Sequence, residues 1–336
     1  MLKWNRKQRR EKGAADGSRS VAEMAAPATS VVVLDRGNNT TCTVNLHGAT
    51  VVSWRVNNQE QLFVSKQAIF DGKRAIRGGI PIVFPQFGPW STGPQHGFAR
   101  ICRWELKKPP ERLPTGDVEA MFQLLDNEFT RSMWNYPFSL TYRLILREKE
   151  LHFNISVYNP GAETLSFTLL LHTYFKVPDV RRCQVTGMRG CTYIDKVSLV
   201  VLICSCSTDV QESHTNHRFT NCGLILYAFS VVWNPWIEKA KEIPDFGEEE
   251  FPNLVCVEAG HVSAPVILPP GTVFEASQIL QVIICRDFMC SFQVILEQNG
   301  FTDEKYLVVS SRVILCSVVI KCKLIHQITK KNYNTA

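Results

Sequence analysis

The sequence lacks a hydrophobic run long enough to span a bilayer. Its longest apolar runs, residues 197–206 and 313–320, are too short or too interrupted for the roughly 20 residues that a transmembrane helix needs. It also lacks the pattern of a secretory signal peptide, because the basic start leads into residues 13–17, which are small and polar. We therefore expect a soluble, cytoplasmic protein that does not bind membranes.

Several catalytic and metal-binding motifs are also missing. No CxxC, P-loop, HExxH or GxSxG is present, and no GxGxxG follows a strand-like segment. The eight histidines show no spacing to carboxylates that is typical of metal ligands, so we expect no metal site. The chain has 12 cysteines, and Cys42, Cys102 and Cys256 lie in apolar stretches. A free thiol there behaves as a small buried hydrophobe, which favours a reducing compartment.

The net charge of +6 is concentrated in residues 1–29. These residues are basic and then rich in small side chains, which predicts a disordered arm. Its basic run could also serve as a nuclear localisation signal. Without the arm the charge is nearly balanced, so we expect no nucleic-acid partner.

From residue 30 onward, short runs rich in β-branched and apolar residues alternate with Asn, Gly and Pro. This spacing, with few helical patterns, predicts an all-β sandwich or barrel. The predicted strands include residues 30–34, 42–46, 50–56, 120–125, 139–147, 151–158 and 164–175. Residues 77–88 (RGGIPIVFPQFG) contain three glycines and two prolines, which predicts an ordered loop of the kind that carries binding residues.

Two residues in strand-like runs are candidates for acid–base chemistry. His172 projects from the more polar face of residues 166–175, although it could equally be a structural histidine. Glu258 lies within an apolar run, where a carboxylate is costly to bury unless it is paired or used. Burial would raise its pKa and make it a better base near neutral pH. The alternative is an edge-strand glutamate that faces water.

A third candidate is the run QHGFAR (95–100), together with Arg77 upstream. Arg77 and Arg100 suit a phosphate, which a guanidinium can hold through two parallel hydrogen bonds. Gln95 suits hydroxyl groups. Each of these signals is weak when taken alone.

Five motifs in fixed order make the sequence resemble a known family. They are RGGIPIVFPQFG (77–88), PQHGFAR (94–100), LLLHTYF (169–175), VVWNPWIEKAK (231–241) and VCVEAGH (255–261). Together they resemble the hexose-6-phosphate mutarotases, the glucose-6-phosphate 1-epimerases, of the aldose 1-epimerase superfamily. The similarity covers residues 31–196 and 231–282.

The resemblance implies a galactose-mutarotase-like β-sandwich, or supersandwich, that interconverts the α and β anomers of glucose 6-phosphate. It assigns catalysis to His172 and Glu258, and substrate binding to Arg77, Gln95 and Arg100, with His96 beside them. The reaction opens and closes the sugar ring by proton transfer, so no cofactor and no metal are expected. We expect a monomer whose partner is a small sugar phosphate.

Two segments depart from the family pattern. Residues 197–230 replace a stretch that should supply strands and a substrate-binding aspartate, and residues 283–336 form an atypical C-terminal tail. The predicted organisation is therefore an arm (1–29), a sandwich domain (30–282, atypical at 197–230) and the tail (283–336). Alternative functions are an epimerase for unphosphorylated aldoses, a non-catalytic carbohydrate-binding isoform, and a carbohydrate-active lyase or hydrolase.

Overall fold

A computed structural model describes residues 30–186, 192–195, 200–203, 223–226, 230–282, 293–298, 308–311 and 319–330. Within these ranges the regular secondary structure is mostly β-strand. The helices are α1 (Glu128–Met133), α2 (Trp236–Glu242) and three 3₁₀ turns, η1 (Ala99–Ile101), η2 (Val180–Arg182) and η3 (Glu248–Asn253). The all-β class predicted from the strand spacing is confirmed. Of the helices that the structure describes, none has the length and apolar character needed to cross a membrane.

The first sheet is an antiparallel meander. Its strands, in spatial order, are β1 (Val31–Gly37), β2 (Thr40–Asn45), β3 (Thr50–Val56) and β4 (Gln59–Glu60). Asn38 and Asn39 connect the first pair, and Asn57 and Asn58 connect the last. All four asparagines have positive φ. A two-residue hairpin turn requires positive φ at both positions, which asparagine tolerates better than most residues.

The second sheet has seven strands. In spatial order they are β19 (Gln293–Gln298), β21 (Val319–Lys330), β18 (Thr272–Gln281), β9 (Glu150–Tyr158), β8 (Ser139–Leu146), β7 (Val118–Leu125) and β6 (Glu105–Arg112). Buried and partly exposed residues alternate along β8 and β9, as expected for strands with one face on the core. Pro109 and Pro110 lie in β6 at the sheet edge, where a missing N–H breaks no ladder.

The third sheet carries the candidate site. Its order is β14 (Val200–Ile203), β13 (Thr192–Asp195), β15 (Gly223–Leu226), β16 (Ser230–Trp233), β17 (Leu254–Leu268), β10 (Leu165–Leu171) and β5 (Ile82–Val83), and β11 (Tyr174–Lys176) also pairs with β17. Strand β10 is buried on both faces. Phe167, Leu169 and Leu171 join the main core, whereas Leu170 packs with Val83 and Val231 on the opposite face. A separate two-stranded pair joins β12 (Cys183–Thr186) to β20 (Val308–Ser311).

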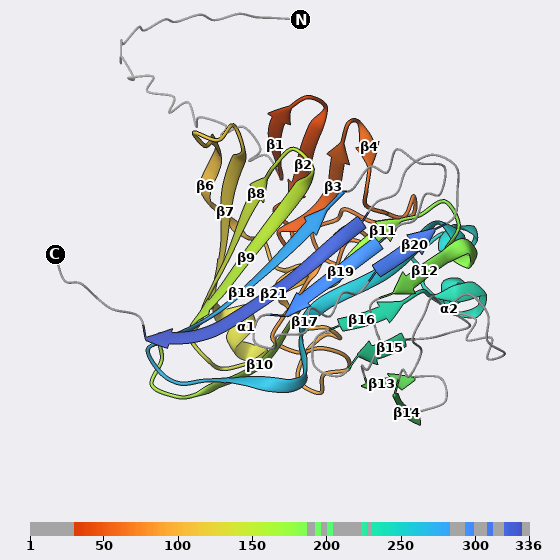
Figure 1. Cartoon of the computed structure of the whole chain (residues 1–336). Helices are drawn as coiled ribbons and strands as arrows, with labels where there is room; N and C mark the ends of the chain where they lie inside the picture. The colour runs from red at the N-terminus through yellow and green to blue at the C-terminus, as the bar shows by residue number, and fades with distance from the viewer. Residues whose placement is uncertain are drawn as a thin grey trace, which may run out of the picture.

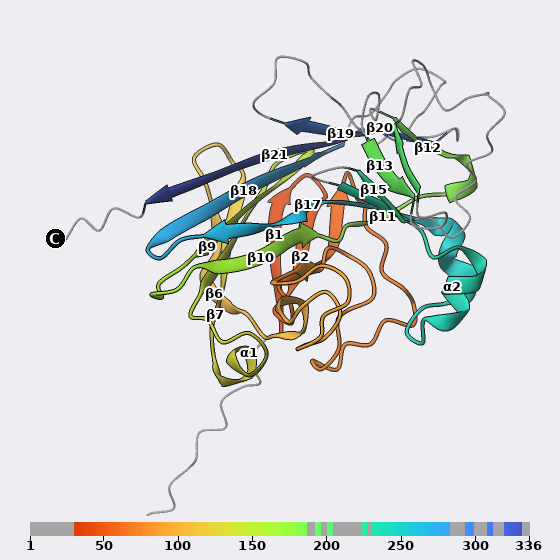
Figure 2. The same ribbon diagram turned by 90° about the horizontal axis from the view of Figure 1, so that it is seen from below.

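The second and third sheets pack face to face. Phe167 of β10 meets Phe274 of β18 edge-on, with ring centroids 5.7 Å apart. Leu169 and Leu171 from one sheet and Phe153 from the other line the same small cavity. Figure 2 shows β18 and β21 in one layer and β10 and β17 in the next, and Figure 1 shows the strands of the long sheet side by side. Burial of these apolar side chains is the main force that holds the sandwich together.

The predicted domain organisation is only partly covered by the described residues. Residues 1–29, the predicted disordered arm, lie outside them. Strands β14 and β15 lie within 197–230. Strands β19, β20 and β21 lie within 283–336, and β21 pairs antiparallel with β18 from Thr272 to Ser277. The remaining residues of these two segments lie outside the described ranges, and the proposed boundaries stay predictions.

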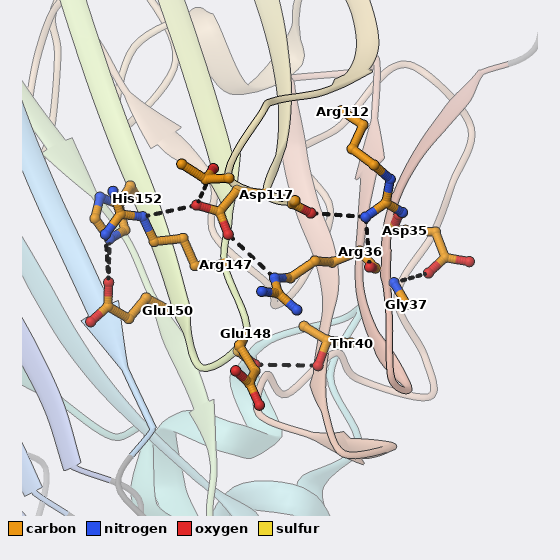
Figure 3. A network of polar contacts seen from close by, with 12 residues as sticks. Asp35, Arg36, Gly37, Thr40, Arg112, Asp117, Arg147, Glu148, Glu150 and His152 are labelled. Carbon is orange, nitrogen blue, oxygen red and sulfur yellow. Dashed lines mark hydrogen bonds and ion pairs between the residues drawn. The ribbon is translucent and has the colours of Figure 1, made fainter.

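A network of charged side chains joins the first sheet to the second (Figure 3). Asp117, just before β7, pairs with Arg36 of β1 at 3.3 Å and with Arg147 at 3.5 Å, and it accepts a hydrogen bond from Thr115. Arg112 of β6 donates to the backbone carbonyls of Asp35, Arg36 and Gly116. The network fixes the end of β1 against the β6–β7 hairpin.

We expect Asp117→Ala to lower the free energy of unfolding by about 1–3 kcal/mol, because it removes a buried carboxylate that pairs with half-buried Arg36 and also holds the exposed Arg147 and Thr115. Urea denaturation of the variant and the wild type would measure the loss. Glu111→Ala is the matched control, since this carboxylate is 60% exposed and pairs with Lys108. Its loss should be at most about 1 kcal/mol. Equal losses in the two variants would contradict a connecting role for Asp117.

Candidate active site

The third sheet brings His172 and Glu258 into direct contact. His172 follows β10, and Glu258 lies in β17, the strand that pairs with β10 through Leu171 and Ala259. The His172 Nε2 atom lies 3.3 Å from Oε1 of Glu258. The two residues are only 7% and 2% exposed. Within the described part of the chain, two of their atoms, His172 Nδ1 and Glu258 Oε2, are buried without a hydrogen-bond partner.

Three aromatic rings hold the His172 imidazole in place. Tyr174 stacks on it with a centroid distance of 4.7 Å and an interplanar angle of 12°. Trp233 of β16 and His96 lie edge-on to it, at 6.0 and 5.8 Å. The backbone N–H of His172 donates to the carbonyl of Pro81 at 3.0 Å. Packing and backbone bonding therefore fix which way Nε2 points.

Burial shifts the pKa values of the two groups toward their neutral forms. It raises the pKa of Glu258 well above its usual value, although nearby Arg100 opposes the shift. Burial also lowers the pKa of His172 well below its usual value, and His96, Arg100 and Arg77 lower it further. Both shifts favour a protonated Glu258 next to a neutral His172. One proton is then shared across the 3.3 Å contact.

Two arginines lie beside this pair. Arg77 is held by Asp245, whose Oδ1 lies 3.0 Å from Nε. The Arg100 guanidinium donates through Nη2 to the carbonyl of Gln95 at 2.7 Å. Burial lowers the pKa of Arg100 to about 10, so it is still charged at neutral pH. The site therefore has positive charge next to a buried acid–base pair.

The loop that carries Gln95, His96 and Arg100 is closely packed against the sheet. Gly97 has a φ of +74°, and a Cβ there would lie 2.1 Å from the carbonyl oxygen of Phe84, so only glycine fits. The Gly88 N–H donates to His96 Nδ1 at 3.1 Å, which places the proton of the neutral ring on Nε2. Burial, then Arg100 and Arg77, lower the pKa of His96 to about 3. His96 is therefore neutral at ordinary pH.

The structure brings the residues singled out in the sequence together at one place. His172, Glu258, Arg77, Arg100 and His96 are mutually close, and the exposed Gln95 side chain lies 3.3 Å from His96. Sequence reasoning missed the residues that support them, which are Tyr174, Trp233 and Asp245. Tyr174 was detectable from its position two residues after His172 on a strand-like run. No local pattern indicated that Asp245 would hold Arg77.

Replacing Glu258 by glutamine should change stability in a pH-dependent way. The folded wild type keeps the Glu258 proton at pH values where the unfolded chain has released it. Its free energy of unfolding therefore falls by about 1.4 kcal/mol per pH unit between the usual pKa, about 4.3, and the raised folded pKa.

Glu258→Gln has no such proton, so its stability relative to the wild type should increase through that interval. Thermal unfolding between pH 4 and 8 would measure the difference. A constant difference between Glu258→Gln and the wild type would show that the carboxyl group titrates normally.

Comparison with known proteins identifies the family to which this chain belongs. A family model described as aldose 1-epimerase matches residues 30–220. A Cenchrus ciliaris protein named "Putative glucose-6-phosphate 1-epimerase" is 33% identical over 71% of this chain and 80% of its own length.

Solved structures give the same result for the fold. A crystal structure described as a "putative mutarotase" from Salmonella typhimurium has a TM-score of 0.64 and 25% identity, over 74% of this chain and 88% of that one. A galactose mutarotase related enzyme from Lactobacillus acidophilus shares the fold, with a TM-score of 0.55 and 15% identity over 86% of this chain and 99% of that one. The predicted galactose-mutarotase-like sandwich is confirmed. The chain therefore belongs to the aldose 1-epimerase family of isomerases.

Proposed function

We propose that this epimerase interconverts the α and β anomers of D-glucose 6-phosphate and related hexose 6-phosphates. The observation that carries the proposal is the position of Arg77 and Arg100 beside the buried His172–Glu258 pair, close enough to lower the pKa of His172. The pair supplies proton transfer, and the arginines supply recognition of an anion. The similarity to the Cenchrus ciliaris protein named for this activity supports the same substrate class.

The chemistry needs one base and one acid. The base takes the proton of the C1 hydroxyl while the acid protonates the ring oxygen. The bond between C1 and the ring oxygen then breaks, and an aldehyde forms at C1. Rotation about C1–C2 exposes the other face, and the reverse transfers close the ring. We assign the base to Glu258 and the acid to protonated His172. Each positioned group contributes about a hundred- to ten-thousand-fold to the rate.

Substrate binding provides the reactive charge state. Burial favours the shared proton on Glu258, whereas the assigned roles need it on His172. A dianionic phosphate on Arg77 and Arg100 would offset the positive field that lowers the pKa of His172. The proton could then cross the 3.3 Å contact to His172 Nε2. The proposed substrate thus prepares the acid and the base by its own charge.

The phosphate site combines one supported guanidinium with one less constrained guanidinium. Arg77 is oriented by Asp245 at 3.0 Å, whereas Arg100 donates to the backbone carbonyl of Gln95 at 2.7 Å. Charge-assisted hydrogen bonds from such groups are about twice as strong as neutral ones. Neutral His96 can add an Nε2–H donor without adding charge, which suits a sugar hydroxyl or a phosphate oxygen. Gln95 would contribute at the exposed rim.

We also place the enzyme in the cytoplasm. Cys42, Cys102, Cys183 and Cys256 are free and buried. Free thiols persist in a reducing compartment, where disulfides are rare. A monomer without a nucleic-acid partner remains the expected state.

Anomer exchange measured by NMR on glucose 6-phosphate tests the assignment of the pair. The full chain should accelerate exchange above the spontaneous rate. His172→Gln and Glu258→Gln should each reduce this acceleration by about a hundred- to ten-thousand-fold. His152→Gln is the matched control, because His152 lies in β9 of the second sheet, where it pairs with Glu150 (Figure 3). Full exchange by either site variant would overturn the acid–base assignment.

The phosphate preference has its own test. Arg100→Ala should lower kcat/KM for glucose 6-phosphate by about ten- to a hundred-fold, the range expected for lost charged hydrogen bonds. Its effect on glucose should be much smaller. Arg103→Ala, an exposed arginine three residues further on, is the control and should act like the wild type. Equal losses on both sugars would favour an epimerase for unphosphorylated aldoses, and normal binding without exchange would favour a carbohydrate-binding protein.

A further inference from the structure

One buried side chain in the site has no role in the proposed chemistry. Cys256 lies two residues before Glu258 in β17, so its side chain is on the same face of the sheet. It is fully buried and packs with Phe63, Tyr174 and Leu254. Its position opposite Tyr174 and Trp233 in the neighbouring strands brings it next to the catalytic pair.

His172, Cys256 and Glu258 together present a nitrogen, a sulfur and an oxygen donor. Their ligand atoms all lie within 4.8 Å of one another. A second observation points to a ligand, because Glu258 Oε2 is buried and has no hydrogen-bond partner within the described part of the chain. The donors come from two segments distant in sequence, which is why ligand spacing along the chain gave no sign of them.

The distances suit a small tetrahedral ion. Zinc binds imidazole nitrogen and carboxylate oxygen at about 2.0–2.2 Å and thiolate sulfur at about 2.3 Å. Tetrahedral donors at those lengths lie roughly 3.3–3.7 Å apart. The His172 Nε2 to Glu258 Oε1 distance is already 3.3 Å. A shift of about 1 Å, within reach of a side-chain rotation at Cys256, would complete the set and leave a fourth position open.

We propose that His172, Cys256 and Glu258 form an inhibitory binding site for zinc or a similar borderline-soft divalent ion. The inhibition rests on the proposed function, since the ion would occupy the lone pairs that accept and deliver protons during anomer exchange. Nitrogen and sulfur donors select zinc or cobalt over magnesium or calcium, which prefer oxygen ligands. The ion and the sugar phosphate therefore compete for the same site.

The binding step releases protons. The Cys256 thiol must lose its proton to become a ligand, and so must a protonated Glu258. Both protons go to solvent as the metal–ligand bonds form. Affinity for the ion therefore rises with pH.

Cobalt provides a direct readout that does not depend on activity. Addition of Co²⁺ to the full chain should produce a thiolate-to-cobalt charge-transfer band and visible bands with tetrahedral intensity, and Zn²⁺ should abolish both. The charge-transfer band should be absent in Cys256→Ala and in Cys256→Ser. Cys42→Ala is the matched control, because Cys42 is equally buried but lies in the first sheet. It should keep the band.

Zinc titration of anomer exchange tests the inhibition. Cys256→Ala should keep wild-type exchange, and its half-inhibiting zinc concentration should rise at least about tenfold, the loss that even outer-shell changes cause. Raising glucose 6-phosphate should relieve inhibition of the wild type.

The two proposals fail in different ways. A wild type that exchanges anomers but gives no charge-transfer band overturns the metal site alone, as does unchanged zinc sensitivity in Cys256→Ala. A wild type that gives the band but does not exchange anomers overturns the proposed function and supports the metal site. Retention of the band in Cys256→Ala would show that another thiol holds the ion.

Discussion

Glu258 and His172 meet 3.3 Å apart at a depth where water reaches almost none of either side chain. Burial of two ionisable groups is costly, and both respond by shifting their pKa values toward the neutral forms. The cost of burying the two groups is reduced because they can share one proton. The cationic groups around the pair then decide where that proton lies. A buried pair of this kind adds little to the stability of the fold. It suits a reaction in which a proton is taken from a molecule and another is given to it.

The sandwich explains how the chain holds such a pair. Strand β17 is 15 residues long and pairs with β10, β11 and β16. It is therefore surrounded by backbone hydrogen bonds on both sides. Core residues cover one face of this sheet, and the aromatic rings of Tyr174 and Trp233 cover part of the other. Few side-chain motions remain that could separate Glu258 from His172.

Much of the fold was predictable from local patterns. Residues 139–147 and 151–158 alternate cleanly, and β8 and β9 match these predictions within a residue. The predicted strand over 164–175 is instead two strands, β10 and β11, because the His172 N–H bonds to Pro81 rather than to a neighbouring strand. Contacts such as that between Asp245 and Arg77 join segments far apart in the sequence, and no periodicity encodes them. The same holds for Cys256, which sequence patterning identified only as a buried thiol.

The loop from Arg77 to Gly88 is fastened to the strand that leads to His172. Backbone hydrogen bonds run from Thr168 to Pro85, from His172 to Pro81 and from Tyr174 to Gly79. Arg77 immediately precedes this fastened stretch. The main chain therefore sets the distance between the Arg77 guanidinium and the His172 imidazole. This distance should vary little. If a sugar phosphate binds at Arg77 as proposed, its anomeric carbon would reach the proton-transfer pair only when its carbon chain spans that distance, so the loop would select substrates by the distance between their two functional ends.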